Sequence, residues 1–223
     1  MAALRFWYGT MSSGKSTVAL QIHHNLGLRG HRGLLCTQLD RQGARVSSRL
    51  GVSEPAVEVA PAMDLFDLAG RFAKAEGRLD HLVCDEVQFY EVDQVEQLAR
   101  IVDDLGADVY AFGLLLDFRG RLFPATARLL ELADERIEIQ VEVRCWCGAP
   151  ATHNARVVDG RQVYEGDTVV MGDVGAQGEV PLWGDRVTYE VVCRRHWQAG
   201  EPIGPGPGAG TSGRDREEPS PDP

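Results

Sequence analysis

The chain has 223 residues, of which 43% are hydrophobic and 25% charged, and its formal net charge at pH 7 is -10. This composition is typical of a globular protein with one domain, or with one domain and a smaller second one. The negative charge argues against a nucleic acid as the main partner, because DNA and RNA are polyanions. No apolar run approaches the length of a membrane-spanning helix, and the N-terminus lacks the pattern of a signal peptide. We therefore expect a cytoplasmic protein without a membrane partner.

Strand-like and helix-like segments alternate over the first 140 residues. Apolar runs predict strands at residues 4–9, 32–38, 81–89, 108–118 and 136–144. Apolar residues at three- and four-residue spacing, each run stopped by glycine, predict helices at residues 16–30, 63–77 and 92–106. This alternation indicates an α/β fold in which helices flank a parallel sheet. Ligands of such folds bind at the carboxyl ends of the strands.

The loop between the first strand and the first helix, Gly9–Ser16, fits the phosphate-binding pattern G-x-x-x-x-G-K-[ST]. Its glycines allow backbone N–H groups to approach phosphate oxygens closely. Lys15 supplies a charge for the β- and γ-phosphates, and the Ser16 hydroxyl is placed to bind Mg²⁺. The alternative is an ordinary turn rich in glycine and serine. The full spacing match between strand and helix favours a nucleoside triphosphate site.

Two carboxylates, Asp85 and Glu86, end the third predicted strand. An acidic residue at this position commonly completes the Mg²⁺ site of a phosphate-loop protein. Because side chains alternate along a strand, we expect one carboxylate to face the metal and the other an acceptor hydroxyl. Solvated or capping acids are the alternative. Arg41 follows the second predicted strand and could clamp the transferred phosphoryl group, although loop arginines are often simply solvated.

The chain changes character after residue 140. Residues 141–197 are rich in short β segments and predict a small second domain, and residues 198–223 are rich in glycine and proline and predict a disordered tail. Cys145, Cys147, Cys193 and His196 form a Cys₃His set that suits a structural Zn²⁺. A metal would stabilise a segment too short for a large core. A solvated histidine at position 196 is the alternative for the fourth ligand.

Four motifs occur in order over residues 1–197: Gly9–Thr17, Asp85–Phe89, Gly113–Gly120 with Phe123, and Tyr189–His196. Together they resemble those of the cytosolic-type thymidine kinases, and the cysteine spacing is most similar to the bacterial branch. The resemblance implies a RecA-like phosphate-loop fold with a zinc-bound domain that carries a lasso loop. It also implies transfer of the ATP γ-phosphate to the 5′-hydroxyl of thymidine, a homotetramer and feedback inhibition.

The resemblance assigns roles to particular residues. It makes Glu86 the proton acceptor. The predicted ATP and Mg²⁺ residues are Gly9, Thr10, Met11, Ser12, Ser13, Gly14, Lys15, Ser16, Asp85, Gln88 and Arg41. The predicted thymidine residues are Met11, Phe89, Leu114, Phe118, Phe123 and Tyr189, with Val170, Met171 and Gly172 of the lasso. For any one of these aromatic residues taken singly, core packing is the favoured interpretation.

Two other classes of protein remain open. One is a recombinase-like or motor ATPase, whose acceptor is water and whose partner is a nucleic acid, and the other is a zinc module for binding DNA or protein. The acidic composition counts against both. The lasso region also departs from the family pattern, with Asp173 in place of a glycine and a longer stretch up to Thr188. Such an insertion could weaken base affinity without changing the phosphoryl chemistry.

Overall fold

A computed structural model describes residues 1–39, 44–139, 141–168 and 187–205. Its centre is a six-stranded sheet in the order β5-β2-β6-β7-β1-β8, in which every neighbouring pair is parallel. The strands are β1 (Leu4–Gly9), β2 (Gly33–Thr37), β5 (Val57–Glu58), β6 (His81–Cys84), β7 (Asp108–Leu114) and β8 (Glu135–Glu138). The predicted α/β fold with a parallel sheet flanked by helices is confirmed.

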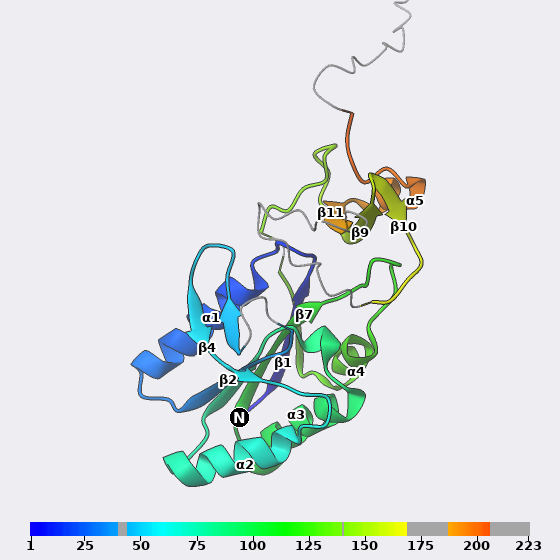
Figure 1. Ribbon diagram of the computed structural model, residues 1–223. Coiled ribbons are helices and arrows are strands. Elements are labelled where there is room, and N and C mark those ends of the chain that lie inside the picture. The colour runs from blue at the N-terminus through cyan, green and yellow to red at the C-terminus, as the bar shows by residue number, and fades with distance from the viewer. Residues whose placement is uncertain (40–43, 140, 169–186, 206–223) are drawn as a thin grey trace, which may run out of the picture.

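Each face of this sheet has its own hydrophobic core. The helices are α1 (Lys15–Leu28), α2 (Leu65–Glu76), α3 (Val92–Leu105) and α4 (Pro124–Leu132). One core joins α2, α3 and α4 to the sheet, and the other joins α1 and the hairpin of β3 (Arg45–Ser47) and β4 (Ser53–Pro55). Side chains alternate between the cores, so that Leu82 and Cys84 of β6 enter the first and Val83 the second. Figure 1 shows the helices on the two sides of the sheet.

Three predicted strands end earlier than their apolar runs, and the fifth, expected at residues 136–144, ends at Glu138. The third ends at Cys84, because Glu86 takes a left-handed backbone conformation with φ 55° and the chain turns into the 3₁₀ helix η1 (Val87–Phe89). The fourth ends at Leu114 and leads to a turn that Asp117 closes by accepting hydrogen bonds from the N–H groups of Arg119 and Arg121. Both turns lie at the carboxyl edge of the sheet, where ligands of α/β folds bind.

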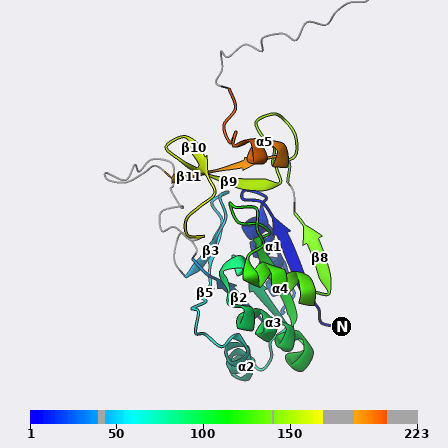
Figure 2. The ribbon, with the colours of Figure 1, turned by 90° about the vertical axis from the view of Figure 1, so that its right-hand side faces the viewer.

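A small lobe lies beyond the carboxyl ends of the central strands (Figures 1 and 2). It consists of the turn at residues 145–149, a three-stranded antiparallel sheet and the helix α5 (Arg194–Ala199). The sheet has β9 (His153–Val158) at its centre, with β10 (Arg161–Val163) and β11 (Val187–Val192) on either side. Its core contains Cys145, Ala155 and Val192. The lobe therefore has little apolar interior of its own.

The start of the predicted tail differs from the expectation. Helix α5 continues to Ala199, and the Trp146 indole N–H donates to the Glu201 carbonyl at 3.0 Å. Gly204 packs so closely on the Trp146 ring that an added Cβ would lie 3.0 Å from it. The glycine content of residues 198–205 predicts an unstructured segment, yet the small size of Gly204 is what allows it to pack against the Trp146 ring. Among the described residues, none of the helices has the length and apolar character needed to cross a bilayer.

Candidate functional site

The phosphate-loop motif connects β1 to α1 at the carboxyl edge of the sheet. Its two glycines are needed for different physical reasons. A Cβ on Gly9 would lie 2.4 Å from the Ile139 carbonyl oxygen, so only glycine allows this close approach. Gly14 has φ +86°, which is strained for residues with a side chain, and it precedes the first residue of α1. The positive end of the α1 dipole therefore points toward the loop, as anion binding requires.

Lys15 is folded back onto this loop. Its ammonium donates to the Thr10 carbonyl at 2.7 Å and to the Ser13 hydroxyl at 3.4 Å, and the residue is only 7% exposed. Burial lowers the pKa of Lys15, while the charges of Glu86 and Asp85 act in the opposite direction. The lysine is thus a buried cation facing two carboxylates. A phosphate anion that entered the loop would favour its charged form.

Asp85 follows β6 and is 1% exposed. Neither of its carboxylate oxygens has a hydrogen-bond partner among the described residues. Burial and the charge of Glu86 raise the pKa of Asp85 to about 7, although the Ser16 hydroxyl and Lys15 favour its ionised form. A buried carboxylate without partners is costly unless a cation compensates it. These features fit a divalent cation between Ser16 and Asp85.

Glu86 and Gln88 form a second pair at this edge. The Gln88 amide donates to the Glu86 carboxylate at 2.5 Å, and its oxygen accepts from the Leu114 N–H of β7 at 2.9 Å. The expectation that strand alternation directs Asp85 and Glu86 to opposite sides is wrong, because both residues lie beyond the end of β6. The left-handed turn at Glu86 separates them instead. Gln88, predicted to serve ATP and Mg²⁺, holds Glu86 against β7.

The predicted nucleoside residues come from separate segments. Phe89 and Phe123 meet edge to face with their ring centres 5.9 Å apart. Phe118 and Tyr189 both lie against the guanidinium of Arg156, with ring centres 3.8 and 5.4 Å from its Cζ. Met11 stands in the phosphate loop itself. The residues therefore form two aromatic groups near the carboxyl edge of the sheet.

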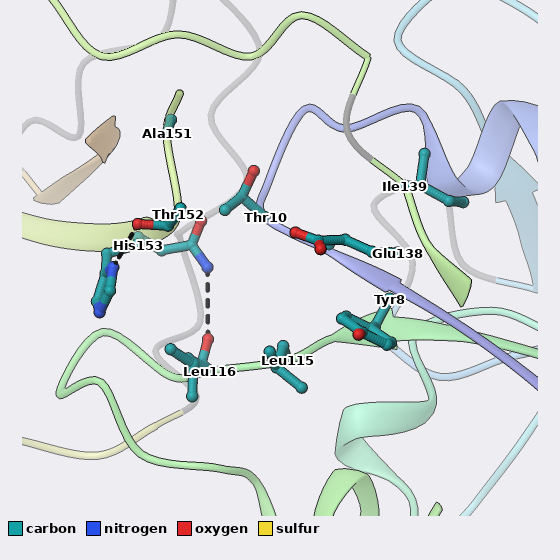
Figure 3. Close-up of a pocket in the computed structure, with 11 residues that line it drawn as sticks. Tyr8, Thr10, Leu115, Leu116, Glu138, Ile139, Ala151, Thr152 and His153 are labelled. Carbon is teal, nitrogen blue, oxygen red and sulfur yellow. Dashed lines mark hydrogen bonds between the residues drawn. The ribbon is translucent and has the colours of Figure 1, made fainter. Parts of the chain in front are cut away.

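A hollow of about 250 Å³ borders the phosphate loop without involving these aromatic residues. Figure 3 shows Thr10 and Glu138 at one side of it and Leu115, Leu116 and His153 at the other. It is lined by Tyr8, Gly9, Thr10, Leu115, Leu116, Glu138, Ile139, Ala151, Thr152, His153 and Asn154. The small lobe thus meets the nucleotide-binding edge directly.

The four predicted metal ligands do come together. The ligand atoms of Cys145, Cys147, Cys193 and His196 all lie within 4.8 Å of one another. The sulfurs of Cys147 and Cys193 are 4.0 Å apart, close to the separation of about 3.8 Å that a tetrahedral zinc with bonds of about 2.3 Å requires. The His196 N–H of the backbone lowers the pKa of Cys193, which favours the thiolate. This Cys₃His group could hold a metal ion.

Two residues that no sequence motif marks contact the phosphate loop. Arg49, in the turn between β3 and β4, donates to the Ser12 hydroxyl at 2.6 Å. Asn154 of β9 accepts from the Met11 N–H at 2.9 Å, and its amide donates to the Leu116 carbonyl at 3.4 Å. Arg49 lies 37 residues from Ser12 in the sequence, and Asn154 lies 143 residues from Met11. No local pattern marks either contact. Only the tertiary fold brings them to the site.

Four predicted site residues lie outside the described part of the chain. They are Arg41, Val170, Met171 and Gly172. The departure from the family pattern at Asp173 lies outside it as well.

Comparison with known proteins agrees with the motifs. The family model for thymidine kinase matches residues 2–197. The thymidine kinase of Cutibacterium acnes is 51% identical over 202 residues, which cover 90% of each chain. That of Streptomyces coelicolor is 52% identical over 197 residues, covering 88% of each chain, and that of Lactobacillus johnsonii is 38% identical over 205 residues, covering 88% of this chain and 96% of the other. Nearly the whole chain, including the phosphate loop and the Asp85-Glu86 pair, is matched, and the chain therefore belongs to the thymidine kinase family, with its bacterial members as relatives.

Proposed function

We propose that this protein transfers the γ-phosphate of ATP to the 5′-hydroxyl of thymidine, giving dTMP and ADP. The observation that supports this most is the meeting of Lys15, Asp85 and Glu86 at one edge of the sheet. A buried cation beside two carboxylates in unlike surroundings provides both charge stabilisation and a proton acceptor. In-line phosphoryl transfer needs both.

Each residue has a distinct task in this mechanism. Glu86 accepts the proton of the 5′-hydroxyl, and Gln88 holds its carboxylate in place by the 2.5 Å hydrogen bond. Lys15 and the loop N–H groups balance the negative charge that spreads over the transferred phosphoryl group. Asp85 and Ser16 would hold Mg²⁺, which when bound neutralises charge on the β- and γ-phosphates. Phe89, Phe118, Phe123 and Tyr189 offer flat surfaces to a pyrimidine ring.

The Cys₃His group supports a structural zinc in the small lobe. Its four ligands leave no open position of the kind that catalytic zinc sites keep. The domain boundaries near residues 140 and 197, a homotetramer and a cytoplasmic location remain predictions from the sequence and the family resemblance.

The test is ADP formation from ATP and Mg²⁺ with and without thymidine. We expect turnover that depends on thymidine and a product phosphorylated at the 5′ position. Lys15→Ala should abolish turnover, because it removes the charge that balances the β- and γ-phosphates, and circular dichroism should show that the variant is still folded. The matched control is Lys74→Ala on α2, which lies far from the loop in sequence and should keep full activity.

Other results would contradict the proposal. ADP formation that is stimulated by single- or double-stranded DNA and is indifferent to thymidine would favour the motor ATPase. Near-normal turnover in Lys15→Ala would show that the phosphate loop is not the nucleotide site.

A further inference from the structure

Arg156, in the middle of β9, is a buried arginine that neither the motifs nor the proposed mechanism uses. It is 3% exposed, although arginine is rarely buried unless its donors are satisfied. Its Nε donates to the Tyr189 hydroxyl at 2.7 Å, and its Nη1 donates to the Asp167 carbonyl at 2.7 Å. Its Nη2 lies 3.4 Å from the Thr168 carbonyl. Each of the three guanidinium nitrogens therefore faces an acceptor.

The guanidinium also lies over an aromatic ring. Its Cζ is 3.8 Å from the centre of the Phe118 ring, the distance of a stacked cation–π contact. Phe118 belongs to the turn that follows β7, and Tyr189 belongs to β11 of the small lobe. Arg156 therefore contacts two predicted nucleoside residues that come from different parts of the chain.

The segment before residue 169 wraps closely around the same group. Gly166 has φ +110°, and a Cβ there would lie 3.5 Å from Arg156 Nη1. The glycine conformation turns the Asp167 and Thr168 carbonyls toward the guanidinium. In sequence, Val170, Met171 and Gly172 follow directly. The start of the predicted base-binding loop is thus attached to the arginine that also positions Phe118 and Tyr189.

We propose that Arg156 is a positioning residue for the nucleoside pocket, acting through Phe118, Tyr189 and the Asp167–Thr168 carbonyls without touching the phosphates. This inference rests on the proposed function and adds a determinant of nucleoside affinity to it. Arginine is required because its rigid fork meets several acceptors in one plane and stacks on a ring. Lysine offers a compact charge that cannot stack in this way.

Kinetics separate this role from a general loss of structure. In Arg156→Met, the KM for thymidine should rise about 10- to 100-fold, since two or three hydrogen bonds and the guanidinium contacts with the Phe118 and Tyr189 rings are lost. The KM for ATP should stay within about twofold, because the phosphate loop keeps its own contacts. Arg156→Lys should give an intermediate KM for thymidine, and calorimetric binding of thymidine without ATP should follow the same order.

Two further variants keep the test informative if Arg156→Met folds poorly. Tyr189→Phe removes only the hydroxyl that accepts from Arg156, so it should raise the KM for thymidine by a smaller factor and leave the KM for ATP unchanged. Arg161→Met, on the exposed side of β10, removes an arginine from the same lobe and should change neither constant. Zinc content and thermal unfolding are measured for each variant.

The outcomes separate this inference from the proposed function. An active wild type whose folded Arg156→Met and Tyr189→Phe variants keep the wild-type KM for thymidine would overturn the inference alone. An equal rise in both KM values would also overturn it, because it would show a disturbance of the whole site. A wild type that does not phosphorylate thymidine would overturn the proposed function and, with it, this inference.

Discussion

At the scale of single residues, Asp85 and Glu86 are neighbours in sequence with unlike surroundings. Asp85 is buried without hydrogen-bond partners, and its pKa is raised to about 7. Glu86 is partly exposed and accepts a hydrogen bond from Gln88. A carboxylate that lacks donors suits a cation, whereas one held by an amide and open to the site suits a proton acceptor. The two residues should therefore not be interchangeable.

Replacing each carboxylate by its amide tests this division. Glu86→Gln keeps the shape but cannot accept a proton, so kcat should fall by about 10²- to 10⁴-fold with little change in the KM for ATP or thymidine. Asp85→Asn should instead raise the Mg²⁺ concentration needed for half-maximal activity. Both variants are measured across a Mg²⁺ titration. Rescue of Glu86→Gln by excess Mg²⁺, without rescue of Asp85→Asn, would mean that the roles are exchanged.

At the scale of elements, a pair of histidines joins α1 to the sheet. His23 Nδ1 of α1 lies 3.1 Å from His81 Nε2 at the start of β6. A Cβ on Gly33 of β2 would lie 2.1 Å from the same His81 nitrogen, so the ring fills the space above a glycine. Burial lowers the pKa of His81 to about 4, with smaller contributions from His23 and His31 that Asp80 and Asp108 oppose. The helix behind the phosphate loop is thus packed on an uncharged imidazole.

This contact predicts a pH-dependent stability. His81 binds a proton more readily in the unfolded chain, at its ordinary pKa of 6.5, than in the folded one, at about 4. Its contribution is therefore fully present above pH 6.5 and is lost as the pH falls toward 4. Between pH 7.5 and 5, the free energy of unfolding should drop by about 2 kcal/mol on this account.

The drop should be absent in His81→Leu, which cannot titrate, and unchanged in His24→Gln, which alters an exposed neighbour on α1. Urea unfolding of the three proteins at both pH values measures it. Equal pH dependence in wild type and His81→Leu would assign the effect to other groups.

The second element-scale prediction concerns the Cys₃His group. One zinc per chain should be found by elemental analysis of protein purified without chelator, and a chelator should unfold the small lobe before the central sheet. Cys193→Ser should reduce the zinc content and loosen the lobe, whereas Cys36→Ser on β2 should leave the zinc content unchanged. Protein free of zinc, or a Cys145–Cys147 disulfide in its place, would contradict this assignment.

At the scale of the whole molecule, the position of a C-terminal truncation should matter. Deleting residues 206–223 should leave kcat, both KM values and thermal stability unchanged, because these residues contain none of the site motifs. Deleting residues 198–223 also removes the Glu201 carbonyl and the Gly204 backbone that cover Trp146. Losing about 1 kcal/mol in this way should lower the Tm by about 2–4 °C. Thermal unfolding of both truncations decides this, and equal Tm values would show that the cover adds no stability.

Local patterns were sufficient for much of this protein. The phosphate loop was recognisable because its glycines and lysine act through neighbouring backbone, and the metal ligands because chelation limits residue type and spacing. The strands and helices around the site followed from hydrophobic periodicity, since each has a face that must be buried. The pattern over-extended the strands at residues 85 and 115, where a left-handed residue and an aspartate-closed turn end an apolar run.

The sequence by itself determined the chemistry: the phosphate loop, the paired carboxylates, the Cys₃His set and the family. Only the tertiary structure decided which residues hold these reacting groups in position. Arg49 and Asn154 at the phosphate loop, and Arg156 between Phe118 and Tyr189, have no local signal. Their partners are mostly distant in sequence, and a hydrogen bond between distant residues depends on where the packed elements place them. A motif records which groups react, whereas packing determines what holds them in position.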